Sequence, residues 1–240
     1  MHNDLIIDVG MHKAFDTEFY LKKGFRVVAI EANPELCAQS SERLGSYVDS
    51  GRLTILNIGM HSEEGEFDFY VNLEKDDWSS FLGWVGARNN TQHKVIKVRC
   101  TTFDKVLAEY GVPYYLKIDI ERHDMHVLRP LLNWPEKPKY ISVEAHEIGY
   151  AGCLWTMGYR KFKLVDQSRL TTVTCPNPPL EGNYVDAKFD GYTSGPFGEE
   201  TPGDWRSLES VVHQYLTQIH TPEGKVLSGN SWFDFHAKLA

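Results

Sequence analysis

Residues 4–34, with the sequence DLIIDVGMHKAFDTEFYLKKGFRVVAIEANP, decide the fold. Residues 5–9 and 26–30 are short apolar runs rich in β-branched residues, which is typical of strands buried on both faces. Between them, apolar residues recur at roughly helical spacing, and Gly24 follows where a helix needs a left-handed end. The order strand, helix, strand within about 30 residues predicts a βαβ unit with parallel strands.

Two residues at the carboxyl ends of these strands indicate a nucleoside site. Gly10 follows the first strand, where the lack of a Cβ atom lets a ligand approach the backbone. Glu31 closes the second strand, where a carboxylate can accept hydrogen bonds from both hydroxyls of a ribose. The alternative is that Gly10 is an ordinary turn residue and that Glu31 is a solvated strand end.

The loop after the first strand distinguishes between possible nucleosides. A dinucleotide needs the pattern Gly-x-Gly-x-x-Gly so that its pyrophosphate can reach the helix N-terminus. Residues 10–15 read GMHKAF, and only the first glycine is present. Because S-adenosylmethionine (SAM) has no phosphate, this loop favours SAM over a dinucleotide.

Length, charge and cysteine usage exclude several classes of protein. The 240 residues suffice for one large domain, and 25 Lys and Arg against 33 Asp and Glu give a net charge of −8. A nucleic-acid binder usually has a basic surface, so we expect no nucleic-acid partner. No apolar run approaches the length of a membrane helix, and we expect a cytoplasmic protein without a signal peptide. The cysteines form no Cys-x-x-Cys pair and are expected to be free thiols.

The alternation of strands and helices continues to residue 174. The further strands predicted are 53–58, 67–71, 95–98, 115–120, 140–143 and 162–165. The further helices predicted are 34–44, 102–110, 123–132, 147–157 and 204–219. Between residue 174 and the last helix the sequence is irregular and rich in Gly and Pro, and we expect it to cover the ligand edge of the sheet.

With these elements placed, the chain resembles the FkbM family of SAM-dependent methyltransferases. Residues 8–17 are similar to the family's first motif, Asp-Val-Gly-Ala-Asn-x-Gly-x-x-Thr, with His12 in the Asn place and Ala14 in the second Gly place. Residues 31–34 (EANP) resemble its Glu-Pro-Asn-Pro. Residues 116–121 (LKIDIE) resemble its Leu-Lys-Ile-Asp-x-Glu, and Arg122 stands where glycine is usual. Residues 142–144 (SVE) and 194–198 (SGPFG) also fit, so the likeness covers roughly residues 4–205.

The resemblance implies a class I methyltransferase fold, an α/β fold whose mostly parallel, roughly seven-stranded sheet is flanked by helices. Residues 1–174 would form the SAM-binding methyltransferase domain, and residues 175–240 a C-terminal extension packed on the same domain. An alanine at position 14 would take one methyl group of space next to the methionine part of SAM. The residues expected to bind SAM are Asp8, Gly10, Met11, His12, Thr17, Glu31, Ala32, Asn33, Gly59 and Asp119.

Family members are mostly O-methyltransferases of sugars or secondary metabolites, and such a reaction needs a base close to the acceptor hydroxyl. Asp119 ends a central strand, where it could face the methionine amino group or the acceptor; the alternative is that it caps the next helix. His123 and His146 each follow a strand at the same edge, and histidine is the commonest general base. We therefore expect Asp119, His123 and His146 to be catalytic, with His123 as the first choice of base.

A divalent-metal site is a second way to acidify a hydroxyl. Four histidines follow different predicted strands at the ligand edge, namely His12, His61, His123 and His146. The candidate metal ligands are Asp119, Glu144 and His146. The alternative is that each histidine is a loop residue or supports another ligand.

The expected acceptor is a small molecule or a glycan, and the aromatic side chains of Trp78, Phe81 and Trp84 could stack on a sugar face or pack in a core. No membrane partner is expected. Two alternative functions remain open at this point. The chain could be a non-catalytic SAM-binding or nucleoside-binding scaffold descended from a methyltransferase, because Ala14 and Arg122 depart from the motifs. It could also be an N-methyltransferase.

Overall fold

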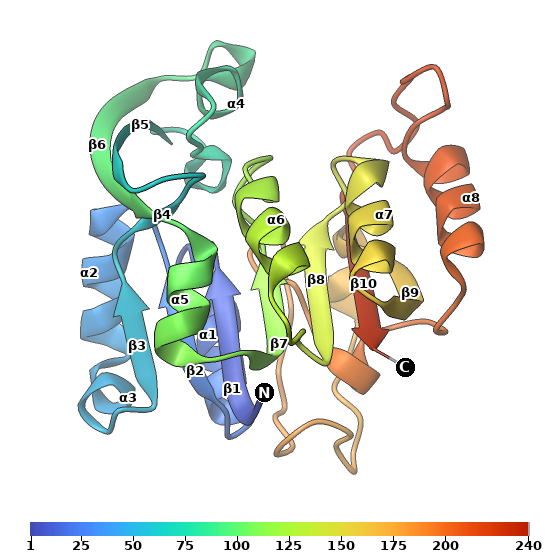
Figure 1. Ribbon diagram of the computed structural model, residues 1–240, viewed down its shortest axis with the longest axis horizontal. Helices are drawn as coiled ribbons and strands as arrows, with labels where there is room; N and C mark the ends of the chain where they lie inside the picture. Colours follow the sequence, from blue (N-terminus) through green and yellow to red (C-terminus); the bar gives the residue numbers. More distant parts are fainter. Residues whose placement is uncertain (240) are drawn as a thin grey trace.

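The central feature of the computed structural model, which describes residues 1–239, is a seven-stranded sheet with the order β3-β2-β1-β7-β8-β10-β9. Six of the strands point the same way, and only β10 is reversed, lying antiparallel to both of its neighbours, β8 and β9 (Figure 1). The strand bounds are β1 His2–Val9, β2 Arg26–Ile30, β3 Leu53–Leu56, β7 Pro113–Ile118, β8 Tyr140–Glu144, β9 Tyr159–Asp166 and β10 Phe233–Leu239. The predicted α/β fold with a mostly parallel sheet is confirmed.

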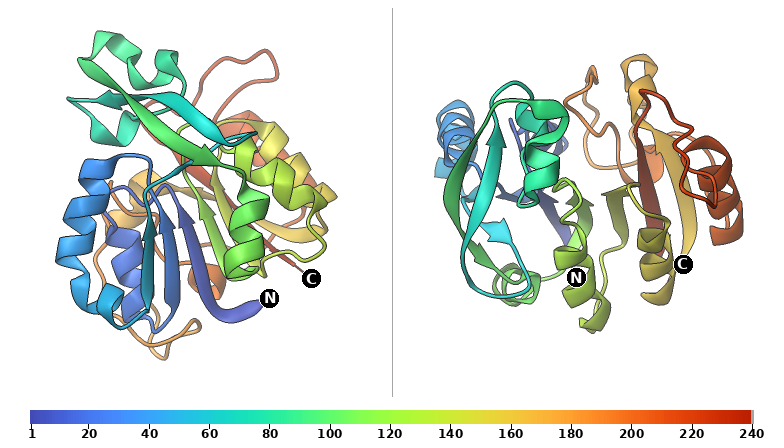
Figure 2. Two further views of the ribbon diagram at one scale, coloured as in Figure 1. Left: turned by 60° about the vertical axis from the view of Figure 1, so that its left-hand side comes forward. Right: turned by 90° about the horizontal axis from the view of Figure 1, so that it is seen from above.

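Helices cover both faces of this sheet (Figures 1 and 2). One face packs against α5 (Phe103–Tyr110), α6 (Met125–Asn133), α7 (Ile148–Thr156) and α8 (Leu208–Gln218). The other face packs against α1 (Phe15–Lys22), α2 (Pro34–Arg43) and parts of the segment 170–205, and α3 (Gly45–Asp49) follows α2. Because both faces are covered, the central strands are almost continuously apolar, as their sequences predict.

A second, three-stranded sheet rises above the carboxyl ends of β1–β3 (Figure 2). Strands β5 (Gly65–Asn72) and β6 (His93–Thr101) form an antiparallel pair, and the short β4 (Gly59–Met60) lies parallel to β6. The connection between β5 and β6 carries the short helix α4 (Gly83–Gly86). We call β4, β5 and β6 the small sheet; it roofs the ligand edge of the large one.

Several predicted element boundaries differ from the structure by two to four residues. The strand predicted for 53–58 ends at Leu56, because the chain then leaves the large sheet for β4. The helices predicted to begin at residues 123 and 204 begin at Met125 and Leu208. Strand β10 was not predicted, although its apolar residues alternate with polar ones from Phe233 to Leu239.

Residues beyond 174 pack against the same body as the rest of the chain. Phe197 contacts the rings of Tyr20 and Tyr115, and the Lys23 Nζ atom lies 2.8 Å from Glu200 in an ion pair that no solvent reaches. Strand β10 then enters the large sheet. None of the helices within residues 1–239 has the length and apolar character needed to span a membrane. All four cysteines are free thiols.

Candidate active site

A cleft of about 760 Å³ lies at the carboxyl ends of β1, β2, β7 and β8. Its floor is formed by the ends of these strands, and its roof by the small sheet and the connection that follows β5. Two parts of the C-terminal region, residues 191–194 and 230–234, close its far side, which confirms that this region covers the ligand edge. In open parallel sheets, ligands bind at this edge.

Gly10 has a backbone conformation that other residues rarely adopt, with a φ angle of +89°. A Cβ atom at this position would lie 1.8 Å from the carbonyl oxygen of Asp119. The amide groups of Gly10 and Met11 both donate hydrogen bonds to the carbonyl of Ile30. The glycine is therefore required by the contact between the first loop and the end of β7, in addition to any approach by a ligand.

Ala14 stands in the second glycine place of the first motif and adopts the left-handed conformation, with a φ angle of 58°. Its side chain is completely buried among the apolar residues between α1 and the sheet, and it does not line the cleft. Its methyl group therefore takes no space from the cleft itself. The departure from the motif instead places the residue in a backbone conformation that costs about 1–2 kcal/mol for an L-residue other than glycine.

Glu31 lines the cleft at the end of β2 with only 8% of its surface exposed. One carboxylate oxygen accepts a hydrogen bond of 2.8 Å from the His12 amide, and the other accepts one of 2.7 Å from the Asn33 amide. Burial raises the pKa of Glu31, while these two amides act to lower it. Each oxygen retains a second lone pair, so the carboxylate is oriented and can still accept a hydrogen bond from a ligand.

Apolar side chains surround the space beside Glu31. Leu36, Ile58, Met60 and Phe69 line the cleft there, together with Ala32. Gly59 lies under them, and a Cβ atom on it would come within 2.2 Å of the Phe81 ring. A carboxylate next to an apolar slot is the arrangement that a ribose joined to a planar base requires.

Lys117 is a buried cation at the centre of the cleft floor. Its Nζ atom lies 3.4 Å from Asp8, 3.4 Å from Asp119 and 3.8 Å from Asp16. Burial alone would lower the pKa of Lys117, but the three carboxylates together raise it well above its ordinary value. The side chain therefore stays charged and holds three chain segments together.

Three residues expected to bind SAM lie behind the wall of the cleft. Asp8 accepts a hydrogen bond of 2.6 Å from the Thr17 hydroxyl, and both side chains are fully buried. Asn33 accepts a hydrogen bond from the Glu35 amide and so begins α2. These side chains support the loops after β1 and β2, while Gly10, Met11, His12, Glu31, Ala32, Gly59 and Asp119 line the cleft itself.

Asp119 is the most open carboxylate near the cleft floor, with 42% of its side chain exposed. It does not cap α6, because Asp124 lies at the N-terminus of that helix and accepts a hydrogen bond from the Ile120 amide. The residue after β7 that bonds across the cleft is Glu121, whose carboxylate lies 2.8 Å from Arg88. Burial and the nearby carboxylate of Glu144 raise the pKa of Glu121 to about 8.

The carboxylates of Glu121 and Glu144 converge with His146. One donor atom from each of these three residues lies within 4.8 Å of the others, and Glu144 is 2.8 Å from the His146 Nε2 atom. Burial raises the pKa of Glu144 and lowers that of His146. Of the predicted metal ligands, Glu144 and His146 are brought together, while Glu121 takes the place that Asp119 was expected to fill.

The four histidines at this edge lie in three different places. The His12 ring is at the cleft, 3.1 Å from Asp76, and His146 is behind Glu144. His61 and His123 do not line the cleft. Instead they lie side by side near His126, and burial together with His126 lowers the pKa of His123 to about 3. The first choice of base is thus outside the cleft.

Several cleft residues were missed by sequence reasoning. A lysine inside the apolar strand 113–118 was a signal for Lys117, because a buried cation requires anionic partners. Asp16, in the first turn of α1, accepts hydrogen bonds from the Ser194 amide on both oxygens, and burial raises its pKa to about 7. Trp232 and Asp234 lie at and beside the start of β10, the strand that was not predicted.

Two features together define a class I methyltransferase. The first is the order of the seven strands, in which one antiparallel strand lies between the last two parallel ones. The second is a cleft with a carboxylate after the second strand. Residues 8–178 match the family of the methyltransferase FkbM domain. This match covers more than half of the chain, and the chain belongs to that family of SAM-dependent methyltransferases.

Comparisons with solved structures give distant likenesses. A methyltransferase FkbM from Methylobacillus flagellatus KT is 17% identical, with a TM-score of 0.45 over 68% of this chain and 40% of that chain. A SAM-dependent O-methyltransferase from Thermotoga maritima is 10% identical, with a TM-score of 0.41 over 100% of this chain and 60% of that chain. An rRNA methylase from Streptococcus thermophilus is 10% identical, with a TM-score of 0.40 over 99% and 88%. This chain therefore spans well under two thirds of the Methylobacillus protein. No curated protein matches the sequence.

Proposed function

We propose that this protein transfers a methyl group from SAM to a hydroxyl of a sugar or another small polar metabolite. The observation that carries the proposal is the position of Asp119, a partly exposed carboxylate between the two halves of the cleft. On one side of it is the nucleoside half with Glu31. On the other side is a half lined by aromatic side chains and carboxylates.

The residues of the nucleoside half fit SAM. Glu31 would accept hydrogen bonds from the ribose, and the slot formed by Ile58, Met60 and Phe69 would hold the adenine. The cleft volume of about 760 Å³ lies within the range of small-molecule sites. When bound, SAM supplies an electrophilic methyl group on a positively charged sulfur and leaves as S-adenosylhomocysteine.

The acceptor half has the chemistry that a polyhydroxylated molecule requires. Trp78, Tyr192 and Trp232 offer ring faces for the C–H faces of a sugar. Asp119, Glu144 and Asp234 offer acceptors for its hydroxyl groups. The net charge of −8 also supports a small acceptor over a nucleic acid. Four free thiols fit a reducing compartment, so a cytoplasmic location is part of the proposal.

The proton of the acceptor hydroxyl must leave as the new carbon–oxygen bond forms. We assign its removal to Asp119, whose carboxylate lies 3.4 Å from the Nζ atom of Lys117. The neighbouring Glu144, 2.8 Å from His146, is the second candidate base, and its raised pKa makes its carboxylate the stronger proton acceptor. Mg²⁺ or Mn²⁺ held by Glu121, Glu144 and His146 would also acidify the hydroxyl. His123 is not assigned a role in this step.

The test is incubation of the protein with SAM labelled in its methyl group and with a panel of glycosides and polyols. We expect label in an alkali-stable ether. Asp119→Asn should lower turnover by about 10²–10⁴-fold, the range for a lost acid–base group. Asp68→Asn on the exposed side of β5 is the matched control and should retain turnover. Activity that survives chelation would exclude the metal route.

A second candidate function is N-methylation of an amine. The observation that favours it is the excess of carboxylates around the cleft, including Asp16, Asp119, Glu121 and Glu144, which would attract a cationic acceptor. Label that appears on amines and not on hydroxyls would establish this reaction in place of the first. Tight SAM binding without transfer to any acceptor would instead establish the non-catalytic alternative.

A further inference from the structure

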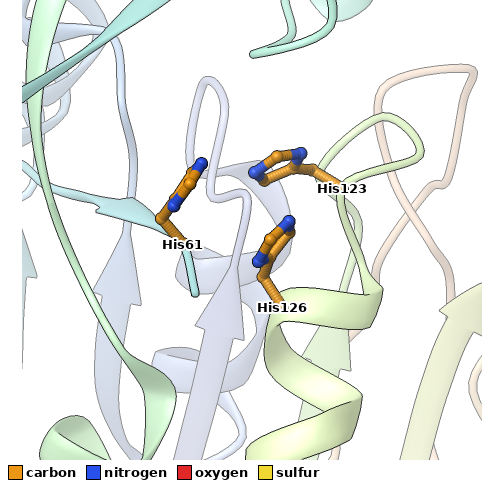
Figure 3. Close-up of side chains that lie close together, drawn as sticks. All are labelled: His61, His123 and His126. Carbon is orange, nitrogen blue, oxygen red and sulfur yellow. The ribbon is translucent and has the colours of Figure 1, made fainter. Parts of the chain in front are cut away.

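Three histidines converge outside the cleft, in a group that we call the histidine cluster. His61 follows β4, His123 lies in the loop after β7, and His126 is in the first turn of α6 (Figure 3). Figure 3 shows the three rings around a common space. One ring nitrogen from each residue lies within 4.8 Å of the other two. The sequence brings only two of them together, at the spacing His-x-x-His, and the fold adds the third.

The backbone and neighbouring rings hold these side chains in place. The His61 amide donates a hydrogen bond of 3.0 Å to the Thr101 carbonyl, and the His61 ring stacks on Phe67 at 3.7 Å between centroids. The His126 amide donates a hydrogen bond of 3.0 Å to the His123 carbonyl. The Ser62 hydroxyl lies 3.3 Å from the Nδ1 atom of His61. Such an outer partner fixes which ring nitrogen faces inward.

The cluster contains a buried polar atom that is left unpaired. His123 is 6% exposed, and its Nε2 atom has no hydrogen-bond partner among residues 1–239. An unpaired polar atom inside a protein is destabilising, and a bound ion is one of the partners that can satisfy it. An exposed histidine can form its hydrogen bonds with water and does not need a bound ion as a partner.

The three imidazoles are also held in the form that binds metal ions. Burial, and the charge that each ring would place beside the others, lower the pKa of His123 to about 3 and that of His126 to about 4. Burial also lowers the pKa of His61. Burial thus favours the neutral imidazole, which has the free lone pair that coordination requires, while the site itself rests on the convergence of the three ring nitrogens.

We propose that His61, His123 and His126 bind one Zn²⁺ ion. Zinc–nitrogen bonds of about 2.0–2.1 Å in a tetrahedron place ligand nitrogens about 3.4 Å apart, so the three ring nitrogens, which lie within 4.8 Å of one another, would move closer by rotation of the rings when the ion binds. Three imidazoles favour Zn²⁺, Cu²⁺ and Ni²⁺ over Mg²⁺ and Mn²⁺, which prefer oxygen ligands. His126 and Ser62 also line a surface groove of about 610 Å³, from which water can supply the fourth ligand.

The position of this site gives the ion a structural role. His61 directly follows β4 of the small sheet, and His123 belongs to the loop that carries Asp119 and Glu121 into the cleft. A zinc ion would fasten the roof of the cleft to the loop on its floor. The site is separate from Glu121, Glu144 and His146, which would take a harder cation, and it does not depend on the identity of the acceptor.

The test is a zinc titration of metal-free protein in competition with a chromophoric chelator. We expect one Zn²⁺ per chain, and excess Mg²⁺ should not displace it. His61→Ala and His126→Ala should each weaken binding by more than about 100-fold, because the loss of even an outer partner of a ligand costs 10–100-fold. His126→Gln, which keeps the volume of a side chain at the start of α6, is a second variant in case the alanine variant does not fold.

His213→Ala is the matched control, since His213 is exposed on α8 and should not affect zinc binding. Glu144→Gln should also leave zinc binding unchanged. Co²⁺ in place of Zn²⁺ should give the visible absorption of a tetrahedral nitrogen-ligated ion. No bound zinc, zinc binding that is unchanged in both His61 and His126 variants, or zinc binding lost only in Glu144→Gln would each overturn the proposal.

Discussion

The Nζ atom of Lys117 lies 3.4 Å from the Oδ1 atom of Asp8, and both side chains are buried. This contact joins β7 to β1 directly under the cleft. Replacing the lysine would leave a buried carboxylate without its cation. The stability of the fold and the shape of the site therefore both depend on this ion pair.

Lys117→Met should lower the free energy of unfolding by about 3–5 kcal/mol, the usual effect of removing one partner from a buried pair. Urea denaturation of the purified variant measures this change. Lys97→Met, which removes an exposed pair with Asp68, is the control and should have little effect. Wild-type stability in Lys117→Met would mean that Asp8 takes up a proton once the lysine is absent, a change that its burial already favours.

Glu31→Gln should weaken SAM binding by about tenfold to a hundredfold, because hydrogen bonds to a charged acceptor contribute roughly 1.5–3 kcal/mol. The glutamine keeps the shape of the side chain, but its NH2 group cannot accept a hydrogen bond, so one of the bonds from the His12 and Asn33 amides is lost as well. Calorimetric titration measures the affinity. Glu35→Gln on the exposed start of α2 provides the comparison, and equal affinities in the two variants would show that Glu31 does not contact the ribose.

Ala14→Gly should leave the free energy of unfolding within about 1 kcal/mol of the wild type. Glycine relieves about 1–2 kcal/mol of left-handed strain, and the lost methyl group removes about 0.8 kcal/mol of apolar burial. Because Ala14 does not line the cleft, the affinity for SAM should not change. A large gain in affinity on titration would mean that the methyl group does restrict the cofactor.

His236 on β10 should make the fold sensitive to acid. The ring is buried, its Nε2 atom has no partner in residues 1–239, and Lys163 on the facing strand also opposes its protonation. Burial lowers its pKa to about 3 in the folded state, below the ordinary value of about 6.5. Between these values the unfolded state binds the extra proton, so the stabilisation is complete above pH 6.5 and is lost as the pH falls toward 3.

The measurement is the free energy of unfolding between pH 7 and pH 4 for the wild type and for His236→Phe, which keeps a ring but cannot titrate. The wild type should lose up to about 1.4 kcal/mol per pH unit more than the variant below pH 6.5. The comparison removes the opposite contribution of Asp16, whose raised pKa of about 7 is common to both proteins. Parallel curves would show that the ring is protonated without loss of structure.

The nucleoside half of the cleft could be predicted from the sequence because its parts are local. Gly10 and Glu31 follow neighbouring parallel strands of one βαβ unit, and the ends of such strands must meet. The acceptor half could not be predicted in the same way. It depends on β10, which is distant in the sequence from the strands that it joins, and on the meeting of Asp8 and Asp16 with Lys117.

The position of His123 was missed for a different reason. Glu121 and Arg122 both adopt left-handed conformations, with φ angles of 51° and 69°, and they turn the chain away from the cleft before His123. Residues other than glycine rarely take this conformation, so their side chains gave no sign of a sharp turn. The turn was indicated instead by the family motif, which usually has glycine at the position of Arg122.

Strands β8 and β9 do not pair with each other, and only β10 joins them. During synthesis, β9 therefore cannot enter the large sheet until residues 233–239 have been made. Until then, its exposed edge must be protected from pairing with other chains. Trp232 and Asp234 reach the cleft with the same strand. A nascent chain that ends before β10 thus has an unfinished sheet and an unfinished acceptor half, so the acceptor site is complete only after the ribosome has added that strand.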